Sequence, residues 1–373
     1  MKKIIGFISL ILILLCILFI TKDTLSISEW YNKYNLLQII PFNSVQTTSY
    51  ITLNNIEKDE VKEIALENGE GIAVSYLMEK DNKVYFGGYG SSNNIYQYDY
   101  TKKEIVNLGK IDSKYESINP FSQNLFISLN NGYGKDGGYN SGFCYLENKW
   151  ICNDIRDSDF QIVNGAVYKD YIYALAIPTN INDKASRIIK FNKEFEILEE
   201  TYLNTYELID NMIYFYQYND RLFLIGVDSL LGYLKIVEVD ENLQITNIKK
   251  YNDLEALKYK TCTPYSIYEK SEGEFYIELS CESGNSSIIQ ENDNYILSIN
   301  LKLDNYISYN INNQLIKGVD FLNKIIFTQD TDWKSNSKIK FHIYDLNMNH
   351  LNTIELEQQK IPILIDVSSY LIN

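Results

Sequence analysis

A short pattern that recurs about every 45 residues constrains the fold of this chain more than any other feature of its sequence. The pattern is an apolar residue, any residue, a variable residue and a second apolar residue, followed by Asp, Asn or Glu. Its seven copies are YITLN, IYQYD, FCYLE, IIKFN, IVEVD, ILSIN and FHIYD, which end at Asn54, Asp99, Glu147, Asn192, Asp240, Asn300 and Asp345. The intervals between these ends are 45, 48, 45, 48, 60 and 45 residues. Each copy continues through a polar turn into another apolar run, which is typical of a β-hairpin.

A second pattern, a turn followed by an apolar strand, precedes six of these seven hairpins. Its copies are NKVYFGG, QNLFISL, KDYIYAL, NDRLFLI, EGEFYIE and NKIIFTQ. A further apolar stretch lies before each copy, so that one unit contains four strands, A to D. A period near 45 residues with four strands each is typical of propeller blades. We therefore predict an all-β fold, a β-propeller of seven four-stranded blades, with six blades as the alternative.

The two ends of the chain together supply the strands of the seventh blade. The first hairpin, residues 49–67, lacks strands A and B, whereas the stretch near residues 362–368 reads as a strand A and little more. Pairing the two ends would close the ring, and closure removes two sheet edges that would otherwise be exposed.

One unit resembles the kelch repeat. The stretch NKVYFGGYGSSNNIYQYD carries the paired glycines Gly87 and Gly88 on its second strand, followed by a Tyr-rich third strand. The other units lack this pair, no unit has the kelch tryptophan, and the signatures of WD40 repeats are absent. The resemblance therefore concerns propeller architecture over residues 46–373 and implies no particular activity.

The N-terminus reads as a membrane anchor. Lys2 and Lys3 precede an uncharged apolar run of 17 residues from Ile4 to Ile20. As a helix this run is roughly 26 Å long, close to the hydrocarbon thickness of a bilayer. No cleavage site of small residues follows it, which favours an anchor over a cleaved signal peptide. We predict an anchor or signal in residues 1–22, a juxtamembrane spacer in 23–45 and the propeller in 46–373. The lysines place the propeller outside the plasma membrane on a single-pass anchor, or make it secreted if the segment is cleaved.

Four cysteines outside the anchor form two mirrored pairs. Cys144 and Cys152 flank a turn at residues 147–149. Cys262 and Cys281 flank a turn near Ser271, and this turn would set Tyr268 opposite Phe275. Directly opposed residues in an antiparallel pair lie within reach of a disulfide. Two disulfides fit an exported protein, with four buried free thiols as the alternative. Zinc is disfavoured, because the chain has no C-x-x-C motif.

Long loops between strands B and C gather on one face of the predicted ring. Aromatic residues beside carboxylates in such loops suit sugar or peptide ligands, although each residue could instead be merely solvated. The candidate ligand-binding residues are Tyr89, Tyr133, Asp136, Tyr139, Asp183, Asp330, Asp332 and Trp333. Trp333 is the most informative of them, since its charged neighbours predict an exposed binding anchor.

Other functions are disfavoured by what the sequence lacks. The net charge is −15 and no Lys/Arg cluster exceeds a pair, which argues against a nucleic-acid partner. Asp330 and Asp332 begin like a calcium loop, but Lys334 holds the next ligand position, so no metal or cofactor is predicted. His342 falls in a predicted C strand as a packed histidine and His350 in a C–D turn, so a nucleophile–histidine site is not expected.

These observations favour a non-catalytic, membrane-anchored propeller outside the cell that binds a protein, peptide or glycan. One alternative is a carboxylate-dependent lyase or glycosidase with its site at the channel mouth. Another is an accessory subunit of a cell-envelope complex. A pair of convergent carboxylates at the channel would favour the enzyme.

Overall fold

The structure is a computed structural model that describes residues 24–26, 33, 36–40, 50–55, 58, 60–65, 78–87, 94–111, 115–179, 186–206, 213–228, 233–251, 260–283, 293–311, 313–330, 338–357 and 364–367. Within these residues the chain forms 29 strands and one short 3-10 helix, η1 (Leu203–Tyr206). The predicted all-β class is therefore confirmed.

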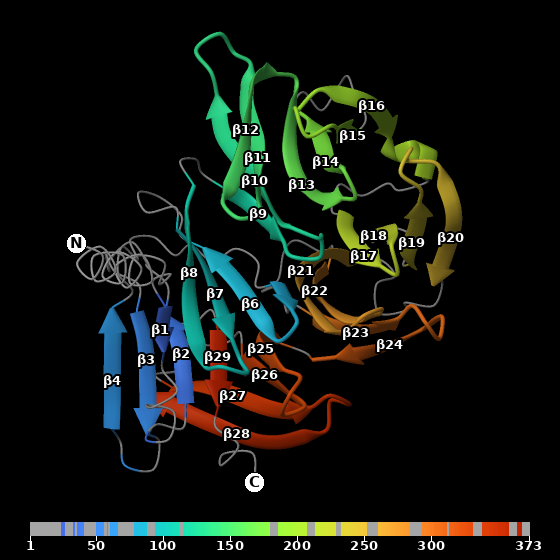
Figure 1. The fold of residues 1–373 in the computed structure, drawn as a ribbon. Coiled ribbons are helices and arrows are strands. Elements are labelled where there is room, and N and C mark those ends of the chain that lie inside the picture. Colours follow the sequence, from blue (N-terminus) through green and yellow to red (C-terminus); the bar gives the residue numbers. More distant parts are fainter. Residues whose placement is uncertain are drawn as a thin grey trace, which may run out of the picture.

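The strands form a propeller of seven blades, each a four-stranded antiparallel meander, as predicted (Figure 1). Blade 1 contains β29 (Leu364–Val367), β2 (Leu36–Ile40), β3 (Tyr50–Asn55) and β4 (Glu60–Ala65). Blade 2 contains β5 (Met78–Lys80), β6 (Lys83–Gly87), β7 (Asn94–Asp99) and β8 (Glu104–Lys110). Blade 3 contains β9 (Tyr115–Asn119), β10 (Leu125–Tyr133), β11 (Tyr139–Leu146) and β12 (Trp150–Ser158).

The remaining blades follow in chain order. Blade 4 contains β13 (Phe160–Tyr168), β14 (Tyr171–Pro178), β15 (Arg187–Phe191) and β16 (Ile197–Tyr202). Blade 5 contains β17 (Ile213–Tyr218), β18 (Arg221–Asp228), β19 (Tyr233–Val239) and β20 (Ile245–Tyr251). Blade 6 contains β21 (Lys260–Ser271), β22 (Glu274–Ser283), β23 (Asp293–Asn300) and β24 (Asn305–Asn310). Blade 7 contains β25 (Gln314–Asp320), β26 (Ile325–Asp330), β27 (Lys338–Asp345) and β28 (His350–Glu357).

Both ends of the chain build blade 1. The C-terminal strand β29 pairs with β2 in a register that sets Gln38 opposite Ile365, and β2 pairs with β3. The predicted closure is thus confirmed, but one detail of the prediction is wrong. The chain supplies its own strand B, β2, from residues that the sequence analysis assigned to the spacer 23–45. Five residues flanked by polar stretches carry too short a pattern to be recognised as a strand.

A second part of the predicted spacer also joins the propeller. Strand β1 (Thr24–Ser26) pairs antiparallel with β8 and sets Leu25 opposite Ile105. Blade 2 therefore has a fifth strand, which covers its outer edge. A covered edge cannot pair with a second chain.

The repeated Asp or Asn has a structural role, because it caps the turn between strands C and D. Its side-chain oxygen accepts backbone N–H groups of the turn in five of the seven copies, at Asp99, Asn192, Asp240, Asn300 and Asp345. In blade 7, for example, Asp345 accepts from the N–H groups of Asn347 at 2.8 Å and Asn349 at 2.9 Å. Short polar side chains favour such turns because they bond their own backbone a few residues on. The sequence period is therefore the period of these turns.

Tyrosine hydroxyl groups connect successive blades. Tyr173 of blade 4 donates to the carbonyl oxygen of Glu241 in blade 5 at 2.9 Å, and Tyr276 of blade 6 donates to that of Leu346 in blade 7 at 3.0 Å. Burial raises the pKa of Tyr276 to about 12. A phenol supplies both a large apolar ring and a polar end for a partner, which explains why a ring of packed blades uses so many of these residues.

The centre of the ring is crossed by protein. The inner strands of blades 2 and 6 pair in parallel, with Met78 opposite Ile267, which brings together strands far apart in the sequence. Figure 1 shows blades 3 to 5 on one side of this contact and blades 7 and 1 on the other. On the first side, the Asn119 amide donates to the carbonyl oxygens of Gly165 at 2.8 Å and Phe215 at 3.1 Å, and so joins blades 3, 4 and 5.

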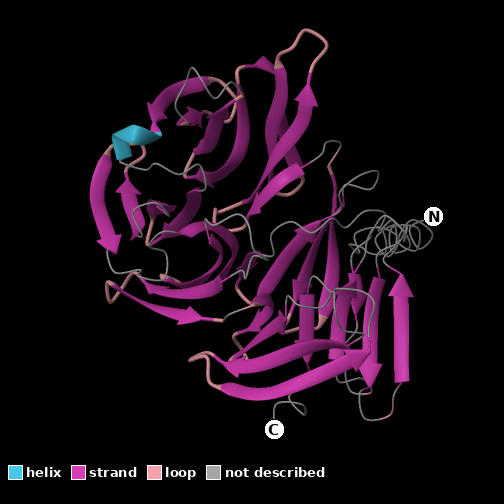
Figure 2. Ribbon diagram, turned by 180° about the vertical axis from the view of Figure 1, so that it is seen from behind, coloured by secondary structure: helices cyan, strands magenta, loops and turns pink. Residues whose placement is uncertain are grey.

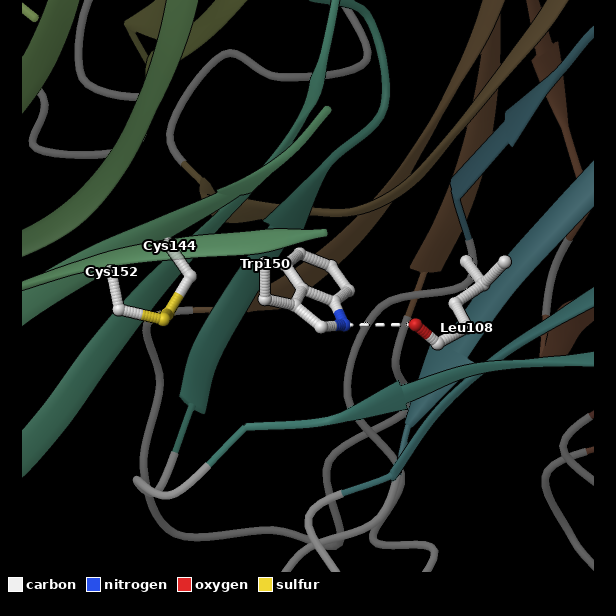
Figure 3. The surroundings of a disulfide bond; sticks show 4 residues. All are labelled: Leu108, Cys144, Trp150 and Cys152. Atoms are coloured by element: carbon white, nitrogen blue, oxygen red, sulfur yellow. Dashed lines mark hydrogen bonds between the residues drawn. A yellow bond between two sulfur atoms is a disulfide. The ribbon is translucent and has the colours of Figure 1, made fainter. Parts of the chain in front are cut away.

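The predicted disulfide of blade 3 is confirmed. Cys144 on β11 lies opposite Cys152 on β12, their Cα atoms are 4.1 Å apart, and their sulfur atoms are bonded. Beside this bond, the Trp150 indole N–H donates to the Leu108 carbonyl oxygen of blade 2 at 2.9 Å (Figure 3). The disulfide thus closes the hairpin that carries this contact between blades.

The second cysteine pair lies on the long β21–β22 hairpin of blade 6. The backbone register sets Cys262 directly opposite Cys281, as predicted, while the two side chains lie outside the described part of the structure. Farther along, the predicted register is wrong by one residue, because Tyr268 faces Tyr276 and Glu269 faces Phe275. A bulge between Pro264 and Ser266 shifts the pairing, and proline lacks the N–H group that a regular ladder requires.

We predict that Cys262 and Cys281 form a second disulfide in the exported protein. Mass spectrometry of a non-reduced digest should find one peptide pair linked through these residues. Replacing both with Ser should lower the free energy of unfolding by about 3 kcal/mol in the chain-entropy model, since the bond closes a loop of intermediate length. Alkylation of both thiols before any reduction would contradict the prediction.

None of the described helical residues forms a segment long and apolar enough to cross a membrane. The predicted anchor in residues 1–22 lies outside the described residues. Figure 2 shows the strands of all seven blades from the opposite side.

Candidate functional site

Four of the eight candidate ligand-binding residues lie within the described structure. Tyr133, Asp136 and Tyr139 lie on blade 3, whereas Asp330 ends strand β26 of blade 7. The other four, Tyr89, Asp183, Asp332 and Trp333, lie outside the described residues, and their predicted roles stay predictions.

The three residues on blade 3 belong to an extended hairpin, not to the irregular loop that the sequence predicted over residues 130–140. Strands β10 and β11 pair as far as Tyr133 and Tyr139, whereas the inner strand β9 pairs with β10 only up to Leu129. A bulge at Gly132 requires a positive φ, 74°, and the Asn130 side chain accepts the Gly132 N–H at 3.1 Å. The hairpin therefore extends beyond the inner strand of its own blade.

Two tyrosine rings contact each other near the end of this hairpin. The Tyr133 and Tyr139 centroids are 5.1 Å apart in an edge-to-face arrangement, which aromatic pairs prefer. Tyr133 is 68% exposed, whereas Tyr139 is only 7% exposed and donates its hydroxyl hydrogen to Asn130. Tyr139 thus supports the exposed Tyr133 ring, and of the two only Tyr133 presents a surface to a ligand.

The surroundings of Tyr133 are polar. The turn that follows it contains the exposed residues Lys135 and Asp136, and Asn131 before it is exposed as well. Tyr133 is also the only large apolar side chain of the described blade 3 residues that stands out as exposed. A single aromatic ring among amide, ammonium and carboxylate groups can stack on one face of a ligand while these groups bond its edges.

Asp330 takes part in a different arrangement on blade 7. Its carboxylate oxygen lies 2.9 Å from His342 Nε2, and His342 Nδ1 lies 3.0 Å from Thr353 Oγ1. The same Thr353 oxygen lies 2.8 Å from His350 Nε2. Strands β26, β27 and β28 thus join Asp330, His342, Thr353 and His350 in one continuous chain of hydrogen bonds.

The direction of this chain follows from the donors available. A carboxylate only accepts, so His342 Nε2 donates to Asp330 and, with a neutral ring, Nδ1 must accept. The Thr353 hydroxyl therefore donates to His342 Nδ1, and His350 Nε2–H donates to Thr353 Oγ1. Asp330 thereby holds His342 in the tautomer whose Nδ1 lone pair faces Thr353 and His350.

Two buried ionisable side chains of opposite charge interact electrostatically where blades 6 and 7 meet. Glu278 on β22 is 0% exposed, and its carboxylate accepts the Ile316 N–H at 2.7 Å; Lys317 on β25 is 8% exposed. Burial raises the pKa of Glu278, against the Ile316 N–H and the charge of Lys317, which lower it. Burial likewise lowers the pKa of Lys317, against the charge of Glu278, which raises it.

Neither cluster of blades 6 and 7 was predicted from the sequence. His342 lies on strand C as predicted, but the prediction of His350 in a C–D turn is wrong, because His350 is the first residue of strand β28. The histidines were not connected with Asp330, which lies 12 residues before His342. The register of the β27–β28 hairpin, which sets His342 opposite Thr353, could have been read from the turn at residues 346–349. Among the described residues, no group of three or more His, Cys, Asp or Glu converges as metal ligands.

No family model matches the chain, and no curated protein matches it. Solved structures similar in fold include a protein of Bacteroides uniformis described as a candidate 6-phosphogluconolactonase, at 13% identity and a TM-score of 0.46 over 90% of this chain and 99% of that one. A mutant of the Synechocystis apocarotenoid oxygenase has 10% identity and a TM-score of 0.48 over 90% and 92% of the two chains. A protein of Lactobacillus plantarum has 9% identity and a TM-score of 0.46 over 89% and 98%. At these values the similarity carries over neither activity nor ligand.

Proposed function

We propose that this chain is a membrane-anchored β-propeller outside the cell that binds a glycan, without catalysing a reaction, at the β10–β11 hairpin. The observation that carries the proposal is the Tyr133 ring, 68% exposed at the end of the extended hairpin and supported by Tyr139. Exposing an aromatic ring to water is unfavourable, and a ring held there by a second ring is suited to a partner.

The polar surroundings favour a glycan over a protein. A protein interface generally has a contiguous apolar centre, whereas the exposed neighbours of Tyr133 along the hairpin are Asn131, Lys135 and Asp136. A sugar ring presents C–H groups on its face and hydroxyl groups around its rim. The Tyr133 ring can stack on that face while the amide and charged groups bond the hydroxyls.

The proposed location rests on two observations. The Cys144–Cys152 disulfide is typical of proteins exposed to oxidising compartments. The uncharged run from Ile4 to Ile20 after two lysines is typical of an anchor that leaves the following chain outside.

Glycan binding can be tested with the full chain in detergent micelles on an array of cell-wall and surface glycans, followed by calorimetry with the best ligand. Tyr133→Ala should weaken binding by about tenfold, which corresponds to 1.4 kcal/mol. Tyr133→Phe should retain most of the affinity, because it keeps the ring. The thermal midpoint should change little, since the side chain is exposed.

Tyr202→Ala is the matched control, because Tyr202 is also an exposed tyrosine (45%) but lies on the outer strand of blade 4. It should leave glycan binding unchanged. Equal affinity of the Tyr133→Ala variant and the unaltered chain would refute the proposal. Capture of a defined set of envelope proteins from solubilised membranes, with no glycan bound, would instead favour the accessory-subunit role.

A carboxylate-dependent enzyme is the second candidate, and the raised pKa of Glu278 is the observation that favours it. However, Glu278 is 0% exposed and contacts the backbone of blade 7. A substrate would reach it only if blades 6 and 7 separated, which is why binding is preferred here.

A further inference from the structure

We propose that His342 and His350 form a site for a divalent transition-metal ion of the copper type, with Thr353 between them and Asp330 behind His342. The site lies on blade 7 and is independent of glycan binding at blade 3. It needs no residue outside the described structure.

The chain places both of its histidines at this one position. Only two histidines occur among its 373 residues, and they lie on adjacent strands of one hairpin. His342 is directly opposite Thr353, and His350 is directly opposite Tyr344, two residues from His342. The strand pairing therefore brings both imidazoles to the same face of the sheet.

Two ring nitrogens converge on a single point. His342 Nδ1 and His350 Nε2 lie 3.0 Å and 2.8 Å from the same Thr353 hydroxyl oxygen. A metal about 2.0–2.1 Å from each nitrogen would lie about 3.2 Å from each ring centroid, so that two rings sharing it have centroids at most about 6.4 Å apart. The observed separation of the two centroids is 5.9 Å, which falls within this limit. Both rings can therefore share one ion that replaces their hydrogen bonds to Thr353, with the His350 proton carried on Nδ1 instead of Nε2.

Asp330 supplies the partner that a metal-binding histidine usually has. Such a histidine donates its second ring N–H to a carboxylate, which fixes the tautomer and raises the basicity of the ligating nitrogen. The Asp330 oxygen lies 2.9 Å from His342 Nε2, so the His342 Nδ1 lone pair is directed at the Thr353 hydroxyl. Asp330 thus acts as a positioning residue and not as a ligand.

The chemistry of the site selects the ion. Imidazole nitrogens with a hydroxyl and open water positions suit copper, nickel and zinc, and divalent copper binds most tightly of these. His350 is exposed while His342 keeps 16% of its side-chain surface exposed, so an ion can enter from solvent. The net charge of −15 also favours the approach of a cation.

The test uses the metal-free full chain in detergent micelles, titrated with CuCl₂ and followed by electron paramagnetic resonance. The spectrum should show one copper ion per chain with two imidazole nitrogens. Because the chain has no other histidine, imidazole signals identify this site. His342→Ala and His350→Ala should each reduce the nitrogen count to one and weaken binding by more than tenfold.

Asp330→Ala separates a positioning role from a merely structural one. It should weaken copper binding by about 10- to 100-fold while both nitrogens remain in the spectrum. Lys340→Gln is the matched control, because Lys340 lies on the same strand in an ion pair with Glu355 at 3.4 Å and is not a proposed ligand. It should leave both affinity and spectrum nearly unchanged.

Two results would overturn the proposal. One is copper binding that both histidine variants retain with an unaltered spectrum, since the ion would then lie elsewhere. The other is a dissociation constant weaker than about 1 mM for the unaltered chain, a free energy of only 4.1 kcal/mol. The hydrogen-bond chain would in either case serve only to hold strands β26 to β28 together.

Discussion

Deleting residues 361–373 is expected to abolish cooperative folding of the whole propeller. The deletion removes β29, which is the inner strand of blade 1 and the only strand that the C-terminus contributes to it. Its loss would expose the edge of β2 and uncover Leu36, Leu37 and Ile39, all of which are buried. A domain of this kind is stable by only about 5–15 kcal/mol, so opening the ring and exposing this core should consume most of it.

Urea unfolding followed by circular dichroism measures the effect. The unaltered chain should unfold in one sharp transition, whereas the deletion variant should show a broad transition at low urea or none. Ile365→Pro is a milder variant, because proline is disfavoured within a β-ladder, and it should lower the free energy of unfolding by less than the deletion does. Deleting only residues 368–373 is the control, since it leaves β29 in place. An unchanged midpoint after loss of residues 361–373 would show that the ring does not depend on its closure.

Closure of the ring was predictable because the four-strand repeat is incomplete at both ends of the chain. In the sequence pattern the first unit lacks strands A and B, and the last stretch reads as a strand A. The Asp, Asn or Glu that ends each copy of the pattern, as at Asp240 and Asp345, recurs in every unit, so seven hairpins could be counted without any knowledge of tertiary contacts. The Cys144–Cys152 bond was predictable for the same reason, since the two cysteines are only eight residues apart and a short hairpin has a well-defined register.

Contacts between blades could not be predicted in this way. The parallel pairing of Met78 with Ile267 joins segments almost 200 residues apart, and neither strand carries a mark of its partner. Strand β2 was missed because five residues do not establish a period. The Asp330–His342 contact and the electrostatic interaction of Glu278 with Lys317 depend on which face of a strand points toward a neighbour, and that depends on bulges such as the one at Pro264.

Among single substitutions, Lys317→Met, which removes the counter-charge of Glu278, should cause the largest loss of stability. Lys317→Met leaves Glu278 buried without a counter-charge, and breaking a buried pair from one side typically costs 3–5 kcal/mol. The double variant Glu278→Gln with Lys317→Met should recover most of the loss, because no charge then remains buried. The measurement is the free energy of urea unfolding of each chain at pH 7.5.

The direction in which stability changes with pH follows from the two pKa shifts. Burial raises the pKa of Glu278 to about 7, above its unfolded value, so its contribution to stability is full at low pH and is lost as pH rises through 7. Burial lowers the pKa of Lys317 to about 8, below its unfolded value, so its contribution is full at high pH and is lost as pH falls through 8. The pair therefore stabilises the fold least between about pH 7 and 8, where both groups are charged.

The unfolding free energy of the unaltered chain should accordingly pass through a shallow minimum near neutral pH, measured between pH 5 and 9. In Lys317→Met only the rise on the acidic side of the minimum should remain, so that the free energy of unfolding increases as pH falls and Glu278 takes up a proton. The double variant should lose the rise on both sides of the minimum. A Lys317→Met chain with unaltered stability at pH 7.5 would contradict the prediction, because Glu278 would then not depend on the charge of Lys317.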